Sequence, residues 1–339
     1  MREIVALKGD RAWFVGRSHI FSTSKERTWV WNQSDGSLVQ EFPKLCRESP
    51  DGVYLLTSFD GQLTLFETKS PRKTAIVRGK YFSHFYSGGS RVVTFDDNAA
   101  TTYVSDVATG REQFSLPGIA ASYGLLGGAR IVTVVDSESS WLWDALTGRQ
   151  LAKVRGHLRS FNRADKRFVT MRNDDLAAWL WDEQGREIAE IQPASGDRLT
   201  NLEFSSNGQR LLVGSRRGDR SGATTSLRDA TTGREIAELK GRADMPKFTL
   251  VVTRDDGACY VWEAATGREL DQMRGQSIEY SADGTRVATI SHAFTSHIWD
   301  AATGREVAAL EGAYPVFSPD GKRVVTNFDD ESVLWELVA

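Results

Sequence analysis

Short acidic pairs recur along this chain and are the first residues whose type and spacing could do chemistry. Paired carboxylates can bind a cation or act as general acid and base. An aspartate in a turn also hydrogen-bonds its own backbone, which by itself explains why the pairs return at regular intervals. We therefore expect turns, and we expect the carboxylates to make one face acidic and attractive to a basic partner. The pairs are Asp96-Asp97, Asp174-Asp175, Asp255-Asp256 and Asp329-Asp330, with single Asp60 and Asp136.

The second chemical feature is an arginine-rich insertion, RRGDRSGAT, which starts at Arg216 and separates two predicted strands. Guanidinium groups bind carboxylates and phosphates, and functional residues are common in loops. We therefore hypothesise a recognition loop that engages such a group on a partner. A tolerated surface insertion that pairs with the acidic turns is the alternative. The candidate partner-binding residues are Arg216, Arg217, Asp219 and Arg220.

Catalytic and metal-binding motifs are missing from the sequence. The five histidines are scattered without a local ligand set, and neither a G-x-S-x-G elbow nor a phosphate-cradling glycine loop occurs. We therefore predict no catalytic residues, no metal, no cofactor and no enzymatic activity. The alternative is an enzyme or small-ligand binder whose scattered residues meet at the mouth of a channel.

These side chains must be positioned by a repeated unit, which is clearest from Asp300 to Glu336 and has a period of about 37 residues. The runs VVT from Val324 and SVLW from Ser332, and the alternating REVAAL from Arg305, each predict a strand. The SPDG and ATGR segments between them are typical of tight turns. Four strands without a helical period predict one antiparallel sheet per unit, and many such sheets in series predict an all-β propeller.

The third strand of each unit carries a marker residue just before its turn, and the markers count the units. The second and fourth strands give the same number. We therefore predict a single closed propeller of nine four-stranded blades, with eight as the alternative because one degenerate unit could be miscounted. The markers are Trp31, Phe66, Ser105, Trp143, Trp181, Arg228, Trp262, Trp299 and Trp335.

The start of the chain copies the last strand of a later unit. REIVALKG from Arg2 matches REIAELKG from Arg234, whereas the chain ends after a third strand. We expect Arg2–Leu7 to pair with the last sheet, which would close the ring and protect both terminal edges. Residues 1–339 would then form one domain, and its start in the middle of a repeat suggests a domain cut from a longer protein.

At these residues the chain resembles the tryptophan–aspartate (WD) repeat family of β-propellers, in its bacterial type with DAATGRE turns, over essentially its whole length. The WD pair is intact at Trp143-Asp144, Trp181-Asp182 and Trp299-Asp300, and it is altered elsewhere, as in Trp262-Glu263. The resemblance implies a scaffold or sensor that binds another protein.

One departure from the family concerns the interior of the blades. A typical WD repeat has a Gly-His pair before its first strand, and only Gly156-His157 fits here. The resemblance therefore implies that the family's His–Ser/Thr–Asp–Trp network is unavailable in most blades. We expect weak polar anchoring and correspondingly more packing by the marker tryptophans, whose fixed position argues for a core and against a carbohydrate platform.

Composition limits the partners. The 339 residues are 40% hydrophobic and 26% charged with a net charge of −3, which favours neither nucleic acid nor an anionic membrane. The arginines that precede second strands, such as Arg91 and Arg210, repeat with the blades, and we interpret them as turn-flanking residues that face solvent. Neither a leader nor an apolar run of roughly 18 residues occurs. Because Cys46 and Cys259 lack metal or redox spacing, we expect a cytoplasmic protein.

The sequence thus predicts a non-enzymatic, monomeric interaction module that presents one loop rim and the channel mouth to a protein or peptide. By resemblance, it is the recognition region of a larger signalling or defence protein. A free-standing scaffold and a designed propeller are the alternatives.

Overall fold

The computed structural model describes residues 8–337 except 9–10, 16–18, 26, 43–45, 60–61, 69–72, 122–128, 163–165, 194–196, 206, 218–222, 244–249, 256–257, 275–276, 282–283, 291–293, 302, 304, 319–320 and 329–330. The described chain is mostly β-strand and contains one short 3-10 turn, η1 (Ser87–Gly89). It falls into two compact units, Met1–Val154 and Arg155–Ala339, and each is described by itself.

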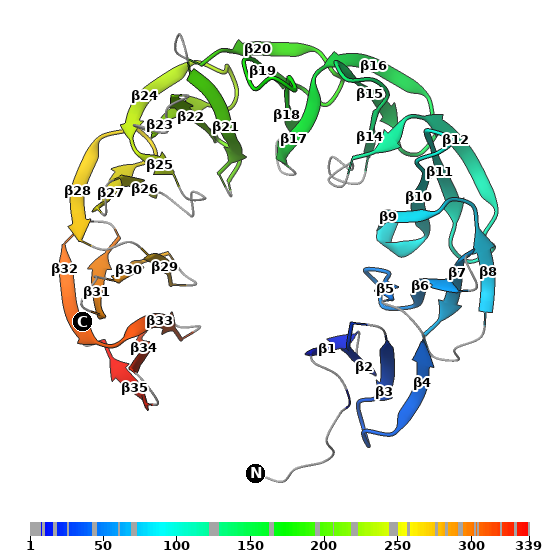
Figure 1. Ribbon diagram of the computed structural model, residues 1–339, viewed down its shortest axis with the longest axis horizontal. Helices are drawn as coiled ribbons and strands as arrows, with labels where there is room; N and C mark the ends of the chain where they lie inside the picture. Colours follow the sequence, from blue (N-terminus) through cyan, green and yellow to red (C-terminus); the bar gives the residue numbers. More distant parts are fainter. Residues whose placement is uncertain are drawn as a thin grey trace. The chain divides into compact units, whose positions relative to one another are not determined.

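The first unit holds four antiparallel sheets, and each consists of four strands that pair in chain order (Figure 1). Tight turns join neighbouring strands, as the SPDG-like and ATGR-like segments predict. The strands are β1 (Arg11–Val15), β2 (His19–Thr23), β3 (Thr28–Asn32) and β4 (Leu38–Phe42); β5 (Arg47–Glu48), β6 (Tyr54–Phe59), β7 (Gln62–Glu67) and β8 (Lys73–Val77); β9 (Tyr81–Tyr86), β10 (Arg91–Asp96), β11 (Thr101–Asp106) and β12 (Glu112–Pro117); β13 (Ile119–Ala120), β14 (Arg130–Val134), β15 (Ser139–Asp144) and β16 (Gln150–Arg155).

The second unit holds five sheets of the same topology, of which the last has three strands in the described part of the chain. The strands are β17 (His157–Asn162), β18 (Arg167–Met171), β19 (Ala178–Trp181) and β20 (Glu187–Ile191); β21 (Asp197–Phe204), β22 (Arg210–Arg217), β23 (Ala223–Asp229) and β24 (Glu235–Lys240); β25 (Arg242–Ala243), β26 (Leu250–Asp255), β27 (Ala258–Glu263) and β28 (Glu269–Arg274); β29 (Ser277–Tyr280), β30 (Arg286–Ile290), β31 (Thr295–Asp300) and β32 (Glu306–Glu311); β33 (Ala313–Phe317), β34 (Arg323–Phe328) and β35 (Glu331–Glu336).

The predicted fold class is confirmed: the protein is an all-β propeller built of nine antiparallel sheets. The predicted closing strand, Arg2–Leu7, lies outside the described residues, so its pairing with β35 stays a prediction. The prediction of a single domain over residues 1–339 likewise stays a prediction.

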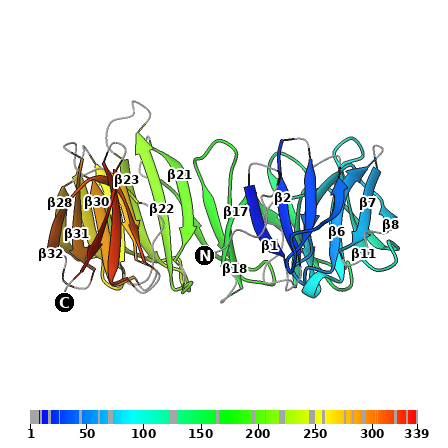
Figure 2. The ribbon, with the colours of Figure 1, turned by 90° about the horizontal axis from the view of Figure 1, so that it is seen from below.

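The strands of each sheet run between two rims of turns (Figure 2). In an antiparallel meander the connection from second to third strand lies at the same end as the crossover to the next sheet. We call this end the crossover rim. The middle strands are buried on both faces, as in β19, where all four residues are buried. Such strands show continuous rather than alternating hydrophobicity because neighbouring sheets cover both faces.

Hydrogen bonds hold the marker tryptophans, of which Trp31, Trp143, Trp181, Trp262 and Trp299 are buried as predicted and Trp335 is half-buried. The Trp262 indole Nε1 donates to Thr253 Oγ1 at 2.8 Å, and the Thr253 hydroxyl donates to the backbone carbonyl of Lys240 in the preceding sheet. Trp335 and Thr326 repeat this arrangement with the carbonyl of Glu311. The indole hydrogen bond to a hydroxyl of the second strand also occurs at Trp31, Trp143, Trp181 and Trp299.

Polar anchoring is therefore present as a short relay from indole through hydroxyl to a neighbouring backbone carbonyl. The expectation that it is weaker than in a typical WD repeat stays a prediction. The relay satisfies the buried indole N–H, which would otherwise lose its hydrogen bond to water on folding.

The arginines before second strands also differ from their predicted role. Arg210 donates from Nε to the carbonyl of Ala264, at 2.8 Å, and from Nη2 to the carbonyl of Ala265, at 3.1 Å. Arg91 makes the same kind of bond to the turn after β15. These side chains therefore connect neighbouring sheets, and the prediction that they only solvate a rim was wrong.

The acidic turns follow their structural interpretation. Asp96 Oδ1 accepts the backbone N–H of Asn98 at 3.0 Å, and Asp174 Oδ1 accepts that of Leu176 at 3.0 Å. Aspartate thus closes its own turn, as expected for a residue that each sheet repeats.

Candidate functional site

The predicted arginine loop begins inside a strand. Arg216 and Arg217 are the last two residues of β22, and Arg216 pairs in register with Arg198 of β21. The insertion therefore lengthens the sheet: β21 and β22 have eight residues each. Asp219 and Arg220 lie outside the described residues, so their predicted role stays a prediction.

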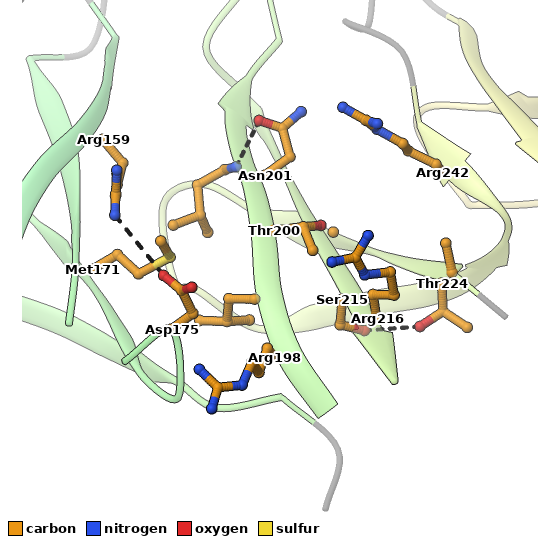
Figure 3. Close-up of a pocket in the computed structure, with 14 residues that line it drawn as sticks. Arg159, Met171, Asp175, Arg198, Thr200, Asn201, Ser215, Arg216, Thr224 and Arg242 are labelled. Carbon is orange, nitrogen blue, oxygen red and sulfur yellow. Dashed lines mark hydrogen bonds and ion pairs between the residues drawn. The ribbon is translucent and has the colours of Figure 1, made fainter. Parts of the chain in front are cut away.

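A pocket of about 560 Å³ lies on the crossover rim beside these extended strands. Its lining comes from sheets β17–β20 and β21–β24 and from the start of β25 (Figure 3). Pockets for organic ligands commonly have volumes of ~300–1,000 Å³. The lining residues are Arg159, Met171, Asp175, Arg198, Leu199, Thr200, Asn201, Leu202, Gly214, Ser215, Arg216, Ala223, Thr224 and Arg242.

Four exposed arginines dominate the lining, and two of them already have partners. Arg159 Nη2 lies 3.9 Å from Asp175 Oδ1, and Arg198 Nη1 donates to the backbone carbonyl of Asp174 at 3.0 Å. Figure 3 shows the carboxylate of Asp175 between the side chains of Arg159 and Arg198. These contacts fix one side of the pocket.

The other two arginines, Arg216 and Arg242, have no ion pair within the described part of the chain. They come from different sheets, and Figure 3 shows Arg216 beside Thr200 and Arg242 farther from it. Each guanidinium keeps its five N–H donors available, in a fork that matches carboxylate and phosphate oxygens. The pocket thus presents donors that are chemically suited to an anion.

Asp175 joins two sheets at this pocket through its backbone. Its carbonyl accepts the N–H of Leu199 at 2.8 Å, and its N–H donates to the carbonyl of Arg172 at 3.0 Å. Its φ of 61° lies in the left-handed region, which aspartate tolerates better than most residues. The carboxylate is thereby held at the edge of the pocket.

Apolar side chains and hydroxyl groups complete the pocket. Met171, Leu199 and Leu202 contribute largely buried apolar surface. The hydroxyls of Ser215 and Thr224 share one hydrogen bond of 2.9 Å, so one of their two hydrogens stays available for a ligand. The apolar side chains therefore form a floor that is already covered by protein, and the groups offered to a ligand are mainly polar.

Gly214 allows β21 to approach β22 closely at the pocket. A Cβ at this position would lie 2.7 Å from the Oγ1 of Thr200. Glycine is thus explained here by the distance between two strands, and its φ is ordinary.

Cations lie close to several of the acidic turns, while Asp60, Asp256, Asp329 and Asp330 lie outside the described residues, so the acidic face stays a prediction. Lys80 lies 3.3 Å from Asp96, and Lys240 lies 3.3 Å from Asp255. At the pocket, the hydrogen bond from the Arg172 guanidinium holds the pKa of the Asp174 carboxyl below its usual value. The lining of the pocket itself is basic, since it holds four arginines and one aspartate.

Sheet β21–β24 also departs from the others in its interior. Arg228 stands where most sheets have the marker tryptophan, and Val213 stands where they have the hydroxyl partner. The Arg228 guanidinium donates to the carbonyl of Gly233 at 3.1 Å and to Glu235 Oε2 at 2.9 Å. The sheet that carries the pocket therefore lacks the indole relay.

Sequence reasoning identified Arg216 but missed the other three arginines of the pocket. Arg159, Arg198 and Arg242 are far from the insertion in sequence and belong to three different sheets. Their positions in the repeat were the signal in the sequence. Each lies near the start of an inner strand, after a crossover, in the sheet with the insertion or in one of its two neighbours. Aligning the crossovers as well as the marker residues would have brought them together.

Metal-binding groups, histidines and membrane-spanning helices are the other features to consider among the described residues. These residues contain no group of three or more His, Cys, Asp or Glu side chains that could hold a metal ion. Two described histidines, His84 and His297, lie in different sheets, and His297 Nδ1 is 2.9 Å from Glu306 Oε1. No helix among the described residues is long and apolar enough to cross a membrane.

Comparisons with known proteins support the fold and leave the family open. No protein-family model matches the chain, and no curated protein matches it. Among solved structures, it is similar to a eukaryotic initiation factor at 11% identity, with 99% of this chain and 87% of that chain covered and a TM-score of 0.55. At this identity the likeness concerns the fold alone.

Two further similarities have lower TM-scores. The computationally designed Ika8 protein is 19% identical, with 99% of this chain and 100% of that chain covered and a TM-score of 0.44. BamB from Moraxella catarrhalis is 15% identical, with 85% and 92% covered and a TM-score of 0.46.

Proposed function

We propose that this protein is a non-enzymatic interaction module that binds an acidic segment of a protein or peptide at the arginine pocket. The observation that carries the proposal is the pair Arg216 and Arg242, two exposed guanidinium groups from neighbouring sheets that no described carboxylate neutralises. Unpaired arginines in a preformed concave site are a common means of recognising carboxylates and phosphates.

The surrounding fold supports a rigid binding site. The pocket is built on strands, with Arg216 inside β22 and Arg242 opening β25. Side chains on strands keep their positions better than side chains on loops, so less conformational entropy is lost when a partner binds. The propeller fold itself fits this role, since such folds display binding surfaces without requiring catalytic groups.

The proposal is tested by direct binding and by affinity capture. A fluorescein-labelled hexaglutamate peptide is titrated with the wild-type protein and with the double variant Arg216→Ala/Arg242→Ala. Affinity should fall about tenfold or more in the variant, because each lost charge-assisted hydrogen bond weakens binding by ~1.5–3 kcal/mol. Proteins captured from the source lysate should be lost in parallel.

The matched control replaces two exposed arginines of the opposite rim, in the variant Arg234→Ala/Arg305→Ala. These residues follow the third strands of their sheets and have no ion pair among the described residues. Because the control removes the same charge, equal losses in both variants would show a general charge effect and would refute binding at the pocket.

A further inference from the structure

We propose that the pocket is a site for a phosphate monoester, bound as its dianion. This inference rests on the proposed function in that it assigns the anion to the same pocket. It goes further by naming the charge and the shape of the group that binds.

The first argument is the charge of the lining. Four arginines against one aspartate give the lining residues a net charge of +3, whereas the whole chain has a net charge of −3. A single carboxylate would neutralise one of the two unpaired guanidinium groups and leave the other without a counterion. A phosphate monoester carries nearly two negative charges at pH 7 and can satisfy both.

The second argument is the number of donors. Arg216 and Arg242 supply two forks, and the hydroxyls of Thr200 and of the Ser215–Thr224 pair supply further donors. A carboxylate has two oxygen atoms, while a phosphate monoester presents three terminal oxygens in a tetrahedral arrangement. Donors that approach from several strands suit the tetrahedral group better than the planar one.

The third argument concerns the remainder of the ligand. The cavity of about 560 Å³ leaves room beside the donors for more than a bare inorganic anion. Asp175 adds an acceptor that can take a hydroxyl or amide hydrogen from the ligand and that repels excess negative charge. The pocket thus fits one phosphoryl group on a compact body.

The test compares two esters of the same shape and different charge. Glucose 6-phosphate and glucose 6-sulfate are titrated against the full chain by isothermal calorimetry at constant ionic strength. The phosphate should bind about tenfold more tightly at pH 8. Its advantage should shrink by about fivefold at pH 5, where the second phosphate ionisation, with a pKa of about 6, is reversed. The sulfate stays a monoanion and corrects for titration of protein groups, including Asp175.

Two variants should shift the affinity in opposite directions. Arg216→Ala/Arg242→Ala should weaken phosphate binding about tenfold or more, whereas Arg234→Ala/Arg305→Ala should not change it. Asp175→Asn should strengthen it about threefold to tenfold, because the repulsive charge disappears and Arg159 loses its partner. Asparagine tolerates the left-handed conformation, so the backbone link to Leu199 is kept.

A phosphoserine pentapeptide serves as the second arm and identifies the source of the phosphoryl group. Tighter binding of the phosphopeptide than of glucose 6-phosphate assigns the site to a modified side chain of a partner, and the reverse order assigns it to a free phosphorylated metabolite. Equal affinity for phosphate and sulfate esters would overturn the inference. If the two esters bound equally but hexaglutamate binding still depended on Arg216 and Arg242, the proposed function would stand and only the phosphate inference would fall. If the Arg216→Ala/Arg242→Ala variant bound both the phosphate ester and hexaglutamate as tightly as the wild-type protein does, the inference and the proposed function would both be refuted.

Discussion

Sheets β17–β20 and β21–β24 are neighbours in one unit and use the same marker position in different ways. In the first, Trp181 is buried and donates its indole hydrogen to Thr170 at 2.8 Å. In the second, the position holds Arg228, which hydrogen-bonds within its own sheet. The second and third strands of the first sheet have five and four residues, whereas β22 and β23 have eight and seven residues and line the pocket.

The difference shows where this repeated fold has freedom to change. One sheet can give up its indole relay because its fully buried residues Leu211 and Leu227 still pack against other sheets. Decay of the repeat signature and gain of a binding surface occur in the same sheet. A degenerate repeat is therefore a better place to look for function than a well-preserved one.

The largest expected effect tests the marker position itself. Trp181→Ala should lower the free energy of unfolding by about 3–5 kcal/mol, because it leaves a large cavity and removes the hydrogen bond that the Thr170 hydroxyl accepts. Arg228→Ala should cost only about 1 kcal/mol, since its ion pair with Glu235 is partly exposed. Urea unfolding measures both. Equal losses of unfolding free energy would mean that Arg228 stabilises its sheet as much as Trp181 does. That result would contradict the contrast between the two sheets.

A second test uses sheet β9–β12, which also lacks the tryptophan and has Ser105 at the marker position. Burial lowers the pKa of His84, on its inner strand, from 6.5 to about 4. Its Nε2 is buried without a hydrogen-bond partner among the described residues, while Nδ1 lies 2.8 Å from Ser83 Oγ. The folded state therefore favours the neutral imidazole.

The sign of the pH effect follows from this lowered pKa. The unfolded chain binds the proton first as pH falls, so the contribution of His84 is complete above pH 6.5 and is lost as pH falls to about 4. The loss should reach about 3 kcal/mol. Unfolding curves of wild type and His84→Gln at a series of pH values measure it, and the variant should have the shallower pH dependence. Parallel curves would show that His84 does not titrate in this window.

The smallest expected effect concerns the close approach of β21 and β22. Gly214→Ala should lower the free energy of unfolding by about 1 kcal/mol, because the new methyl group meets Thr200 Oγ1 and the threonine must rotate. Removing that hydroxyl in Gly214→Ala/Thr200→Ala should restore most of the loss. If the double variant is as unstable as the single one, the strain lies in the backbone of Asn201 and not in the threonine side chain.

The repeat period and the turn residues were enough to predict the nine sheets, because both are local signals. The aspartates of the acidic turns were also assigned correctly, since an aspartate closes its turn using its own backbone. The relay from Trp262 through Thr253 could not be foreseen in the same way. The relay depends on the register between two strands and on a backbone carbonyl of the preceding sheet. The sequence of a single repeat specifies neither of them.

The pocket was predictable only in part for the same reason. Arg216 stood out because the insertion interrupts the period, whereas Arg159 and Arg242 look like ordinary residues of their own repeats. The structural partner of Arg210 was also hidden, because it is a backbone carbonyl of another sheet. Contacts between repeats must be found by comparing equivalent positions across sheets.

The relay has a consequence for the history of such chains. In the relays of Trp262 and Trp335, the hydroxyl binds a main-chain oxygen of the sheet before it, and every amino acid supplies that atom. A sheet can therefore be duplicated, deleted or exchanged during evolution without a matching substitution next to it. Because these bonds between sheets do not depend on the side chain of the bonded residue, one sheet can change in sequence and function while the other sheets keep the fold.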